Sequence, residues 1–424
     1  MKEFISCILF IIICFQNSTA QSLSIEELWR QKDKSSSIQQ KKLNVDAQIE
    51  QLNIRKSERI PIIYGDANLQ RNLIIPITPV PAIAFDPNAA EGAILPLKFS
   101  TKWNSKAGLQ LEWDLFNPNS KSQKEEDVLA YERAKIEELK EIDNWKLNAT
   151  LAYASIVLAT KQYQAAIEDS TLFSEINQVN LDRYKAGRGS SEELILSQQE
   201  LERKRIRLYE SWSILQEANL ELNRYYYNED INFLSSDMNE IINSAENQEF
   251  NKFDYELIEL DIRLSNIQLR GIKRQVLPSL TFNAYYGSQF FNNELNLLDK
   301  SNWYGYSYAN IGLKVPISAY FTNSSSVKKA LINDKIYAAQ LEEIKINDDI
   351  DNKQKLSKVT FAKQKLEGLN KIFILAGRQK KEKYDAYQSG RILLSEFNKV
   401  NSDYLKAQQD VWQAEFDLLN TILE

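Results

Sequence analysis

Residues 194–222 read LILSQQE-LERKRIR-LYESWSI-LQEANLE-L, with a leucine at every seventh position. These leucines are Leu194, Leu201, Leu208, Leu215 and Leu222. An apolar period of seven residues predicts an α-helix that supercoils around a partner helix. The period alone fits any coiled coil, so the surrounding sequence has to decide the fold.

The same stripe of apolar residues returns near the end of the chain, displaced by 203 positions (397 minus 194). Its members are Phe397, Tyr404, Val411 and Leu418. Each stripe follows a short motif containing Tyr, Gly and Arg: Tyr184-Lys185-Ala186-Gly187-Arg188 first, and Tyr387-Gln388-Ser389-Gly390-Arg391 second. Because motif and stripe recur at one displacement, the sequence predicts an internal duplication built on long, packed helices.

Alternation of apolar and polar residues predicts a long β-strand at residues 97–115. This run is far longer than the usual ~5–6 residues of a strand. A counterpart follows at 303–317, and each strand has a partner upstream, near 63–69 and near 279–286. The chain is therefore expected to contain two strand pairs, at about 60–116 and about 277–318.

Two interpretations of these strands compete: a half-buried sheet in a soluble domain, and the lipid-facing wall of a β-barrel. Alternating strands of ~10 residues or more with aromatic residues toward their ends are typical of the barrel. Trp103, Trp113 and the aromatic residues of 303–308 favour it. On this interpretation Leu109, Leu111, Trp113 and Leu115 face lipid, whereas Gln110, Glu112 and Asp114 face the lumen. Four strands cannot close a barrel, since the smallest has about eight, so a barrel must be shared between subunits.

After each strand pair the apolar period changes to spacings of three and four residues, which predicts helices. The first set is Ala149, Ala152, Ile156, Ala159, Tyr163 and Ala166, and the second is Val359, Ala362, Leu366, Leu369, Phe373 and Ala376. Long helices are expected at about 121–184 and 326–387, each roughly 95 Å long at 1.5 Å per residue. Return helices are expected at about 190–226 and 391–424.

The remaining segments complete the predicted organisation. Residues 1–20 have the charge, apolar run and small residues of a cleaved secretory signal peptide; Cys14 leaves lipid attachment open, although Ile13 disfavours it. A first repeat is expected at 21–226, a polar and acidic linker at 227–252, and a second repeat at 253–424. The Pro-rich residues 70–96 are expected to form a loop between the first two strands.

Composition excludes several classes of function. The chain has no histidine, and both of its cysteines lie in the predicted signal, so no imidazole or thiolate is expected for metal binding or nucleophilic catalysis. A net charge of −6 and a pI near 5.3 argue against nucleic-acid binding. No segment after the signal reaches ~18 uninterrupted apolar residues, so no transmembrane helix is expected.

Taken in order, these features resemble the TolC-like outer-membrane efflux proteins over nearly the whole mature chain. The segments that carry the resemblance are Trp113-Asp114-Leu115-Phe116, Val276-Leu277-Pro278-Ser279-Leu280, Val315-Pro316-Ile317 with the serines 324–326, Tyr184-x-x-Gly187 and Tyr387-x-x-Gly390. Each segment is weak alone, but their order and spacing together are specific.

The resemblance implies a mixed α/β membrane protein. Three chains would form one twelve-stranded outer-membrane barrel, continued by a periplasmic tunnel of long helices. An inner-membrane pump and a periplasmic adaptor protein would deliver the substrate, and the duct itself would use no cofactor and catalyse no reaction. The alternative from another class is a soluble periplasmic coiled-coil adaptor or scaffold, and an enzyme is a distant third. The sequence does not indicate which substrate is carried.

The resemblance also implies site residues. Tyr387 and Glu396 fall on the polar network that closes the periplasmic mouth in the family, and Arg391 lies one position before the family's arginine. Lys399 occupies a position where well-known members carry an acidic residue. The residues that fall on the adaptor-docking tips are Tyr184, Gly187, Arg188 and Gly390. The alternative is that Tyr387, Arg391 and Glu396 are ordinary surface residues at a turn.

Overall fold

The computed structural model describes residues 22–227, 233–248 and 252–423. The predicted signal peptide, with Cys7 and Cys14, lies outside these residues. The chain divides into two compact units, which are described separately below. Unit 1 comprises Met1–Val45, Ala134–Leu257 and Leu341–Glu424, and unit 2 comprises Asp46–Arg133 and Ile258–Gln340. The helices α3 (Ser36–Ser57), α4 (Ser120–Lys185), α7 (Asp254–Arg274) and α8 (Ala319–Gln388) continue from one unit into the other.

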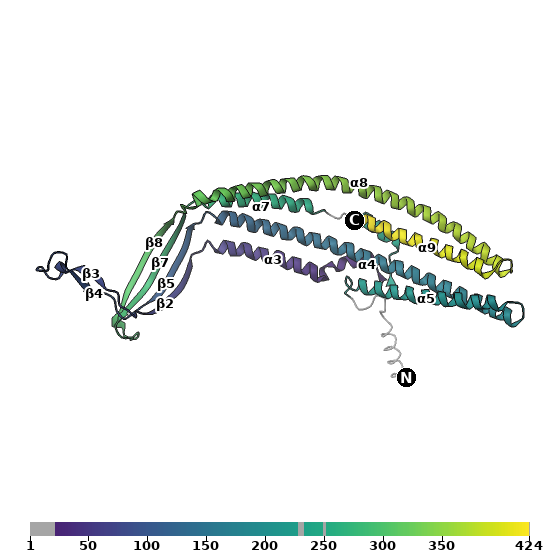
Figure 1. Cartoon of the computed structure of the whole chain (residues 1–424), viewed down its shortest axis with the longest axis horizontal. Helices are drawn as coiled ribbons and strands as arrows, with labels where there is room; N and C mark the ends of the chain where they lie inside the picture. Colours follow the sequence, from purple (N-terminus) through teal and green to yellow (C-terminus); the bar gives the residue numbers. More distant parts are fainter. Residues whose placement is uncertain (1–21, 228–232, 249–251, 424) are drawn as a thin grey trace, which may run out of the picture. The chain divides into compact units, whose positions relative to one another are not determined.

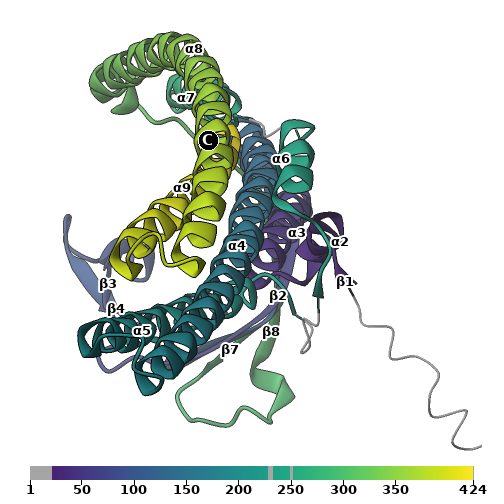
Figure 2. The same cartoon turned by 90° about the vertical axis from the view of Figure 1, so that its right-hand side faces the viewer.

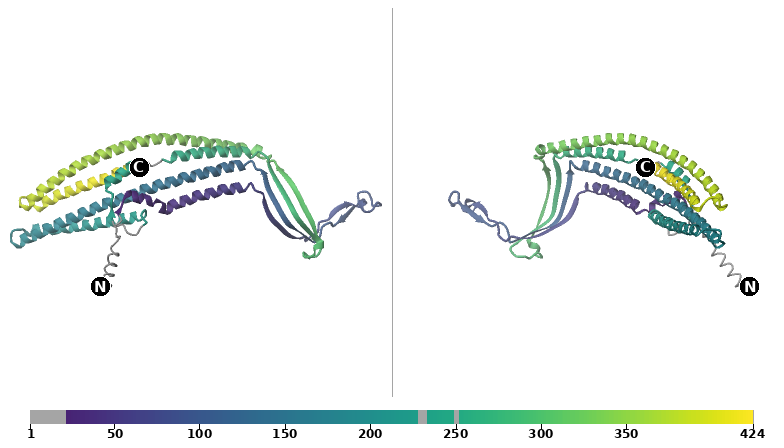
Figure 3. Two further views of the ribbon diagram at one scale, coloured as in Figure 1. Left: turned by 180° about the vertical axis from the view of Figure 1, so that it is seen from behind. Right: turned by 45° about the vertical axis from the view of Figure 1, so that its right-hand side comes forward.

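Unit 2 contains a four-stranded antiparallel sheet with two strands from each half of the chain (Figures 1 and 3). Its strands, in spatial order, are β2 (Ile62–Arg71), β5 (Trp103–Phe116), β7 (Ser279–Asn292) and β8 (Trp303–Lys314). The four predicted strands are therefore confirmed. Among the described residues, the outer edges of β2 and β8 pair with no other strand, so the sheet is open on both sides.

The register of the sheet combines the four alternating patterns into one apolar and one polar face. Leu111 pairs with Ile63 on one side and with Ala284 on the other, and Trp113 pairs with Phe282. Directly opposite residues of neighbouring strands point to the same face. The next row pairs Gln110 with Tyr64 and with Tyr285, and it lies on the opposite face. The faces predicted separately for each strand thus coincide across the sheet.

The segment predicted as a loop at 70–96 has structure of its own, and that prediction is corrected. Strand β2 extends to Arg71, and a small hairpin of β3 (Thr78–Pro81) and β4 (Ile94–Leu97) follows, with a short 3₁₀ helix, η2 (Ala82–Ala84), after β3. Pro79 pairs with Pro96 in this hairpin, which a two-stranded ribbon tolerates because both of its strands are edges. The prolines hid the strand signal, and Leu97 ends β4 rather than beginning β5.

Unit 1 is built from helical hairpins. The C-terminal part of α4 lies beside α5 (Ser191–Leu222), and that of α8 beside α9 (Leu394–Leu423) (Figures 1 and 2). The predicted apolar face of α4 is buried from Ala149 to Ala159, which are exposed by 0% and 2% of their surface, and half-buried at Tyr163 and Ala166. The heptad stripes are packing faces too, since Leu201 and Phe397 are buried. No helix in the described part of the chain is long and apolar enough to cross a membrane.

Several short elements were not predicted. They include the parallel pair β1 (Ser22–Leu23) and β6 (Phe233–Leu234), and the helices α2 (Ile25–Arg30) and α6 (Met238–Glu246). They pack in one buried cluster with the middle of α4 and the end of α9. Tyr153 of α4 joins them, because its hydroxyl donates to the Leu23 carbonyl at 2.6 Å and accepts from the Ser236 N–H at 3.0 Å. Burial raises the pKa of Tyr153, which keeps the hydroxyl protonated as a donor.

Candidate functional site

Helix α4 is terminated by a glycine that the backbone of the turn requires. Gly187 has a φ of 68°, in the left-handed region that residues with a Cβ rarely adopt. Its N–H donates to the Tyr184 carbonyl at 3.0 Å, and the Arg188 N–H donates to the Arg183 carbonyl at 2.9 Å. This pair of bonds is the Schellman motif that terminates helices. No atom lies within 4 Å of the position that a Cβ would take, so the requirement is conformational rather than steric.

The turn between α8 and α9 repeats the same motif. Gly390 has a φ of 73°, and its N–H donates to the Tyr387 carbonyl at 2.9 Å. The Arg391 N–H donates to the Ala386 carbonyl, also at 2.9 Å. The two tips that the sequence predicted from Tyr-x-x-Gly therefore share one backbone geometry. Figure 2 looks onto both turns.

The two tip tyrosines have different surroundings, although their motifs match. Tyr184 is 45% exposed, whereas Tyr387 is 3% exposed. The Tyr387 ring stacks on Phe397, with centroids 5.8 Å apart, and its hydroxyl donates to the side-chain oxygen of Asn180 on α4 at 3.0 Å. Burial raises the pKa of Tyr387, so its hydroxyl remains a neutral donor. The contact with Asn180 joins the second helical hairpin to the first.

Three more contacts join the hairpins at this end. The Phe173 ring of α4 stacks on Phe397 of α9 at 6.4 Å, inside a buried cluster. Arg183 lies with its guanidinium carbon 5.8 Å from the Tyr387 ring centroid, and it donates to the Gln388 carbonyl at 3.3 Å. The tip region is therefore held by an aromatic core with polar bonds at its rim.

The three residues predicted to close the mouth each have a different partner within the chain. Arg391 donates from Nε to the Ser389 hydroxyl at 2.9 Å. Glu396 pairs with the ammonium group of Lys383 at 2.6 Å. Tyr387 is buried, so it is not an ordinary surface residue. Arg391 and Glu396 are exposed. The chain alone thus brings Tyr387 to Asn180 and Glu396 to Lys383.

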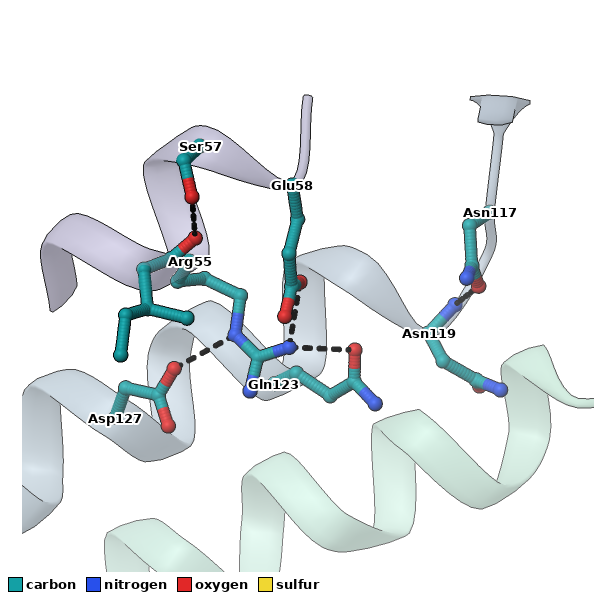
Figure 4. A network of polar contacts seen from close by, with 8 residues as sticks. Arg55, Ser57, Glu58, Asn117, Asn119, Gln123 and Asp127 are labelled. Carbon is teal, nitrogen blue, oxygen red and sulfur yellow. Dashed lines mark hydrogen bonds and ion pairs between the residues drawn. The ribbon is translucent and has the colours of Figure 1, made fainter. Parts of the chain in front are cut away.

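A second polar network lies in unit 2, where the helices meet the strands (Figure 4). Arg55, near the end of α3, donates from Nε to Asp127 at 2.7 Å, and from one terminal nitrogen to Glu58 at 2.8 Å and Gln123 at 3.3 Å. The hydrogen bond to Asp127 is the main cause that raises the pKa of Arg55. Because Gln123 and Asp127 belong to α4, the network ties α3 to the start of that helix.

The other side of α4 is tied to α7 by ion pairs with matching spacing. Arg263 pairs with Glu132 at 2.6 Å, and Arg270 with Glu125 at 2.7 Å. From the first pair to the second, the arginine moves seven residues forward along α7 and the glutamate moves seven residues back along α4. The two helices are therefore antiparallel. A groove of about 1390 Å³ lies beside these pairs; it is lined by the ends of β2 and β5, by α4 and by α7. Among the described residues, no group of His, Cys, Asp and Glu could hold a metal ion.

Several solved structures with the same arrangement of strands and helices are outer-membrane proteins of bacteria. The Campylobacter jejuni CmeC outer membrane channel matches with a TM-score of 0.71 and 14% identity, over 94% of this chain and 84% of that chain. The outer membrane protein VceC from Vibrio cholerae has a TM-score of 0.68 and 12% identity over 94% of each chain. The chain has the TolC-like channel fold.

A third structure with the TolC-like fold is the Neisseria gonorrhoeae MtrE outer membrane channel. It matches with a TM-score of 0.67 and 13% identity, over 94% of this chain and 87% of that chain. No protein-family model matches the sequence, and a search of curated proteins finds no similar one. The fold class predicted from the sequence, with four strands and long helices in each chain, is confirmed.

The TolC-like helices of this chain also enclose a charged cluster that was not predicted. Asp169 of α4 and Lys204 of α5 form an ion pair at 3.0 Å, with side chains only 4% and 3% exposed. Asn401 of α9 is fully buried and donates its amide N–H to Asp169 at 2.7 Å. The ammonium group of Lys204 also lies 4.5 Å from the Phe173 ring centroid. Lys204 follows Leu201 by three residues, the spacing of a coiled-coil seam, and this was the signal available in the sequence.

A second lysine lies near this cluster. The ammonium group of Lys380 on α8 is 4.3 Å from the Tyr404 ring centroid. Burial lowers the pKa of Lys380, and the charges of Asp169 and Glu168 act in the opposite direction. The packing of the two hairpins therefore includes buried charged and polar side chains, whereas a plain coiled coil would be apolar there.

Proposed function

We propose that this chain is one subunit of an outer-membrane exit duct of a tripartite efflux or type I secretion system. The duct conducts substrate passively to the exterior of a Gram-negative-type cell. The observation that carries the proposal is the sheet of long strands with one apolar face and one polar face, joined to long helical hairpins. A soluble adaptor would have no use for an apolar sheet face with Leu109 and Ile311 56% and 66% exposed.

The proposal includes a homotrimer. In the described part of the chain the sheet has two unpaired edges, and such edges cannot remain open in lipid because their N–H and C=O groups would find no partner. Pairing β8 of one chain with β2 of the next removes both edges at once. Three chains of four strands then form one barrel of ordinary size. The apolar face would contact outer-membrane lipid, and the helices would extend into the periplasm.

Prediction one tests the duct directly. Purified from membranes with detergent, the protein should have the mass of a trimer by light scattering, and it should form discrete ion channels in planar lipid bilayers. Carbonate washing should leave it in the membrane fraction. A folded, stable monomer that carbonate releases would contradict the duct and favour the soluble adaptor.

We propose that the tips of the hairpins dock the periplasmic adaptor, to which the inner-membrane pump binds. Tyr184, Gly187, Arg188 and Gly390 are all exposed at these turns, and among the described residues no atom lies within 4 Å of the position that a Cβ would take on either glycine. An adaptor would therefore meet two turns of the same backbone geometry in each chain.

We further propose that Tyr387, Arg391 and Glu396 belong to the gate that closes the periplasmic mouth. The internal duplication suggests how they act between subunits. Lys383 stands 203 positions after Asn180, as Tyr387 stands 203 positions after Tyr184. If the Tyr387–Asn180 contact is repeated between chains, Tyr184 of one chain faces Lys383 of the next. Glu396, already paired with Lys383, would then hold that lysine at the subunit boundary.

Prediction two concerns this gate. The double variant Tyr387→Phe with Glu396→Gln removes the hydroxyl that donates to Asn180 and the negative charge that pairs with Lys383. Single-channel conductance in planar bilayers should rise, while trimer yield stays unchanged. Each exposed ion pair contributes only about 0–1 kcal/mol, but three copies act on one opening.

The matched control is Asp349→Asn on α8, which also removes an exposed pair with a lysine, Lys353. Its conductance should equal that of the wild type. If the double variant also conducts like the wild type, these residues are not the gate, and the constriction lies elsewhere along the helices.

A further inference from the structure

The polar face of the sheet carries tyrosines that the strand register brings together. Gln110 pairs with Tyr64 and with Tyr285, and Tyr285 pairs with Tyr308, so three tyrosines stand in one row across four strands. Tyr306 lies two residues before Tyr308 on β8, and therefore on the same face, where it pairs with Gly287. We call Tyr64, Tyr285, Tyr306 and Tyr308 the tyrosine patch. Its side chains belong neither to the proposed gate nor to the proposed docking tips.

The patch is built around a ring that lies flat on the sheet. Tyr285 is 2% exposed, and its hydroxyl oxygen lies 2.8 Å from the positions that a Cβ would take at Gly108 and at Gly287. The ring therefore fills the space that this cross-strand glycine pair leaves empty. The Tyr308 ring stacks on it at 6.0 Å with an interplanar angle of 15°, and the Tyr306 ring lies 5.7 Å away.

This packing fixes two rings with their outer surfaces free. Tyr306 and Tyr308 are 40% and 38% exposed, and their centroids are 5.7 Å apart. Tyr64, at the other end of the row, is 41% exposed. Side chains held in this way lose little conformational entropy when a ligand binds, so the patch is a preorganised aromatic surface.

The charges around the patch favour a cation. The ammonium group of Lys106 lies 2.7 Å from an oxygen of Asp66 and 5.3 Å from the Tyr285 ring centroid, so its charge is already paired. The Tyr64 hydroxyl donates to Glu112 at 2.6 Å. This hydrogen bond joins the Glu112 carboxylate to a neutral group and leaves its negative charge in place. The faces of aromatic rings attract cations, most strongly where water is partly excluded.

We propose that the tyrosine patch binds organic cations with an apolar body, such as quaternary ammonium or phosphonium compounds, as they pass through the barrel. The inference rests on the proposed function, which places the polar face of the sheet in the lumen and repeats the patch in each of three subunits. It names a substrate class for a duct whose sequence indicates none.

The test uses channel block in planar bilayers by tetraphenylphosphonium, with tetraphenylborate as an anion of the same shape. The cation should block the wild-type channel at lower concentration than the anion. The variant Tyr306→Leu with Tyr308→Leu should raise the half-blocking concentration of the cation about tenfold, because two ring contacts are lost. Tyr306→Phe with Tyr308→Phe keeps both rings, so the half-blocking concentration of the cation should equal that of the wild type.

The matched control is Tyr286→Leu, because Tyr286 neighbours Tyr285 on the same strand but lies on the apolar face and is 77% exposed. It should leave block unchanged. Equal half-blocking concentrations in the wild type and the double Leu variant, or equal block by cation and anion, would overturn the inference. If the double variant does not assemble, each single Leu variant should still raise the half-blocking concentration about threefold.

The two proposals can fail separately. Channels that conduct but are not blocked leave the duct intact and reject the patch. A protein that forms no channel rejects the duct. In that case, equilibrium dialysis of tetraphenylphosphonium against detergent-purified wild type and double Leu variant decides whether the patch binds the cation, with equal retention rejecting it.

Discussion

Asp169→Ala should lower the free energy of unfolding by about 3–5 kcal/mol, although it shortens only one side chain of a helix. The loss is large because Lys204, only 3% exposed, would keep its buried charge without the carboxylate that now pairs with it. Asn401 would also lose the acceptor of its 2.7 Å hydrogen bond. The measurement is the denaturant midpoint of the helical circular dichroism signal of the protein in detergent.

Two controls isolate the buried charge. Asp349→Ala removes an ion pair with Lys353 whose side chains are 65% and 74% exposed, and it should cost at most about 1 kcal/mol. Asp169→Leu combined with Lys204→Met replaces the pair by apolar side chains and should recover most of the lost stability. If Asp169→Ala costs no more than Asp349→Ala, water reaches the pair in the assembled protein and the argument fails.

Leu111→Arg should destabilise the assembled barrel by about 2–4 kcal/mol, the cost of an arginine near the middle of a bilayer. Leu111 shares the apolar face with Ile63 and Ala284, which flank it in the sheet. The effect should appear as a lower temperature at which the trimer dissociates on gels, measured with protein reconstituted in lipid vesicles.

Gln110→Arg is the matched control, since Gln110 adjoins Leu111 but lies on the polar face between Tyr64 and Tyr285. Its dissociation temperature should stay close to that of the wild type. Equal losses at both positions would mean that the apolar face does not contact lipid, and the barrel would then require another orientation.

The features with a long period were predictable from the sequence. Strand alternation at Leu109, Leu111 and Trp113 indicated which side chains share a face, because the two-residue period of a strand leaves no other arrangement. The heptads indicated the packing stripes, of which Leu201 and Phe397 are buried members. The tip motif held in both halves because it is local: a helix that ends in a Schellman turn needs a glycine there.

Other features depend on contacts between distant segments and could not be predicted in this way. Strands β1 and β6 have two residues each, too few for any period. Tyr184 and Tyr387 stand in matching motifs, yet only Tyr387 is buried, because Asn180 and Phe397 surround it. Helix α6 was missed although Asp237 and Glu240 form a capping box, which was readable from the sequence.

The central buried cluster joins residues near opposite ends of the chain. Leu23 and Leu28 pack in the same cluster as Leu418 and Leu423, with Tyr153 between the two groups in sequence. Contacts between residues so far apart form late, because a long loop must close before any of them stabilises the chain. Residues that are synthesised first can therefore pack in this cluster only after the last ones have been made. Until then the apolar stripes of the long helices are exposed to solvent, which favours aggregation. Slow folding, and a need for protection until the whole chain has been made, follow from this topology, whatever side chains fill the cluster.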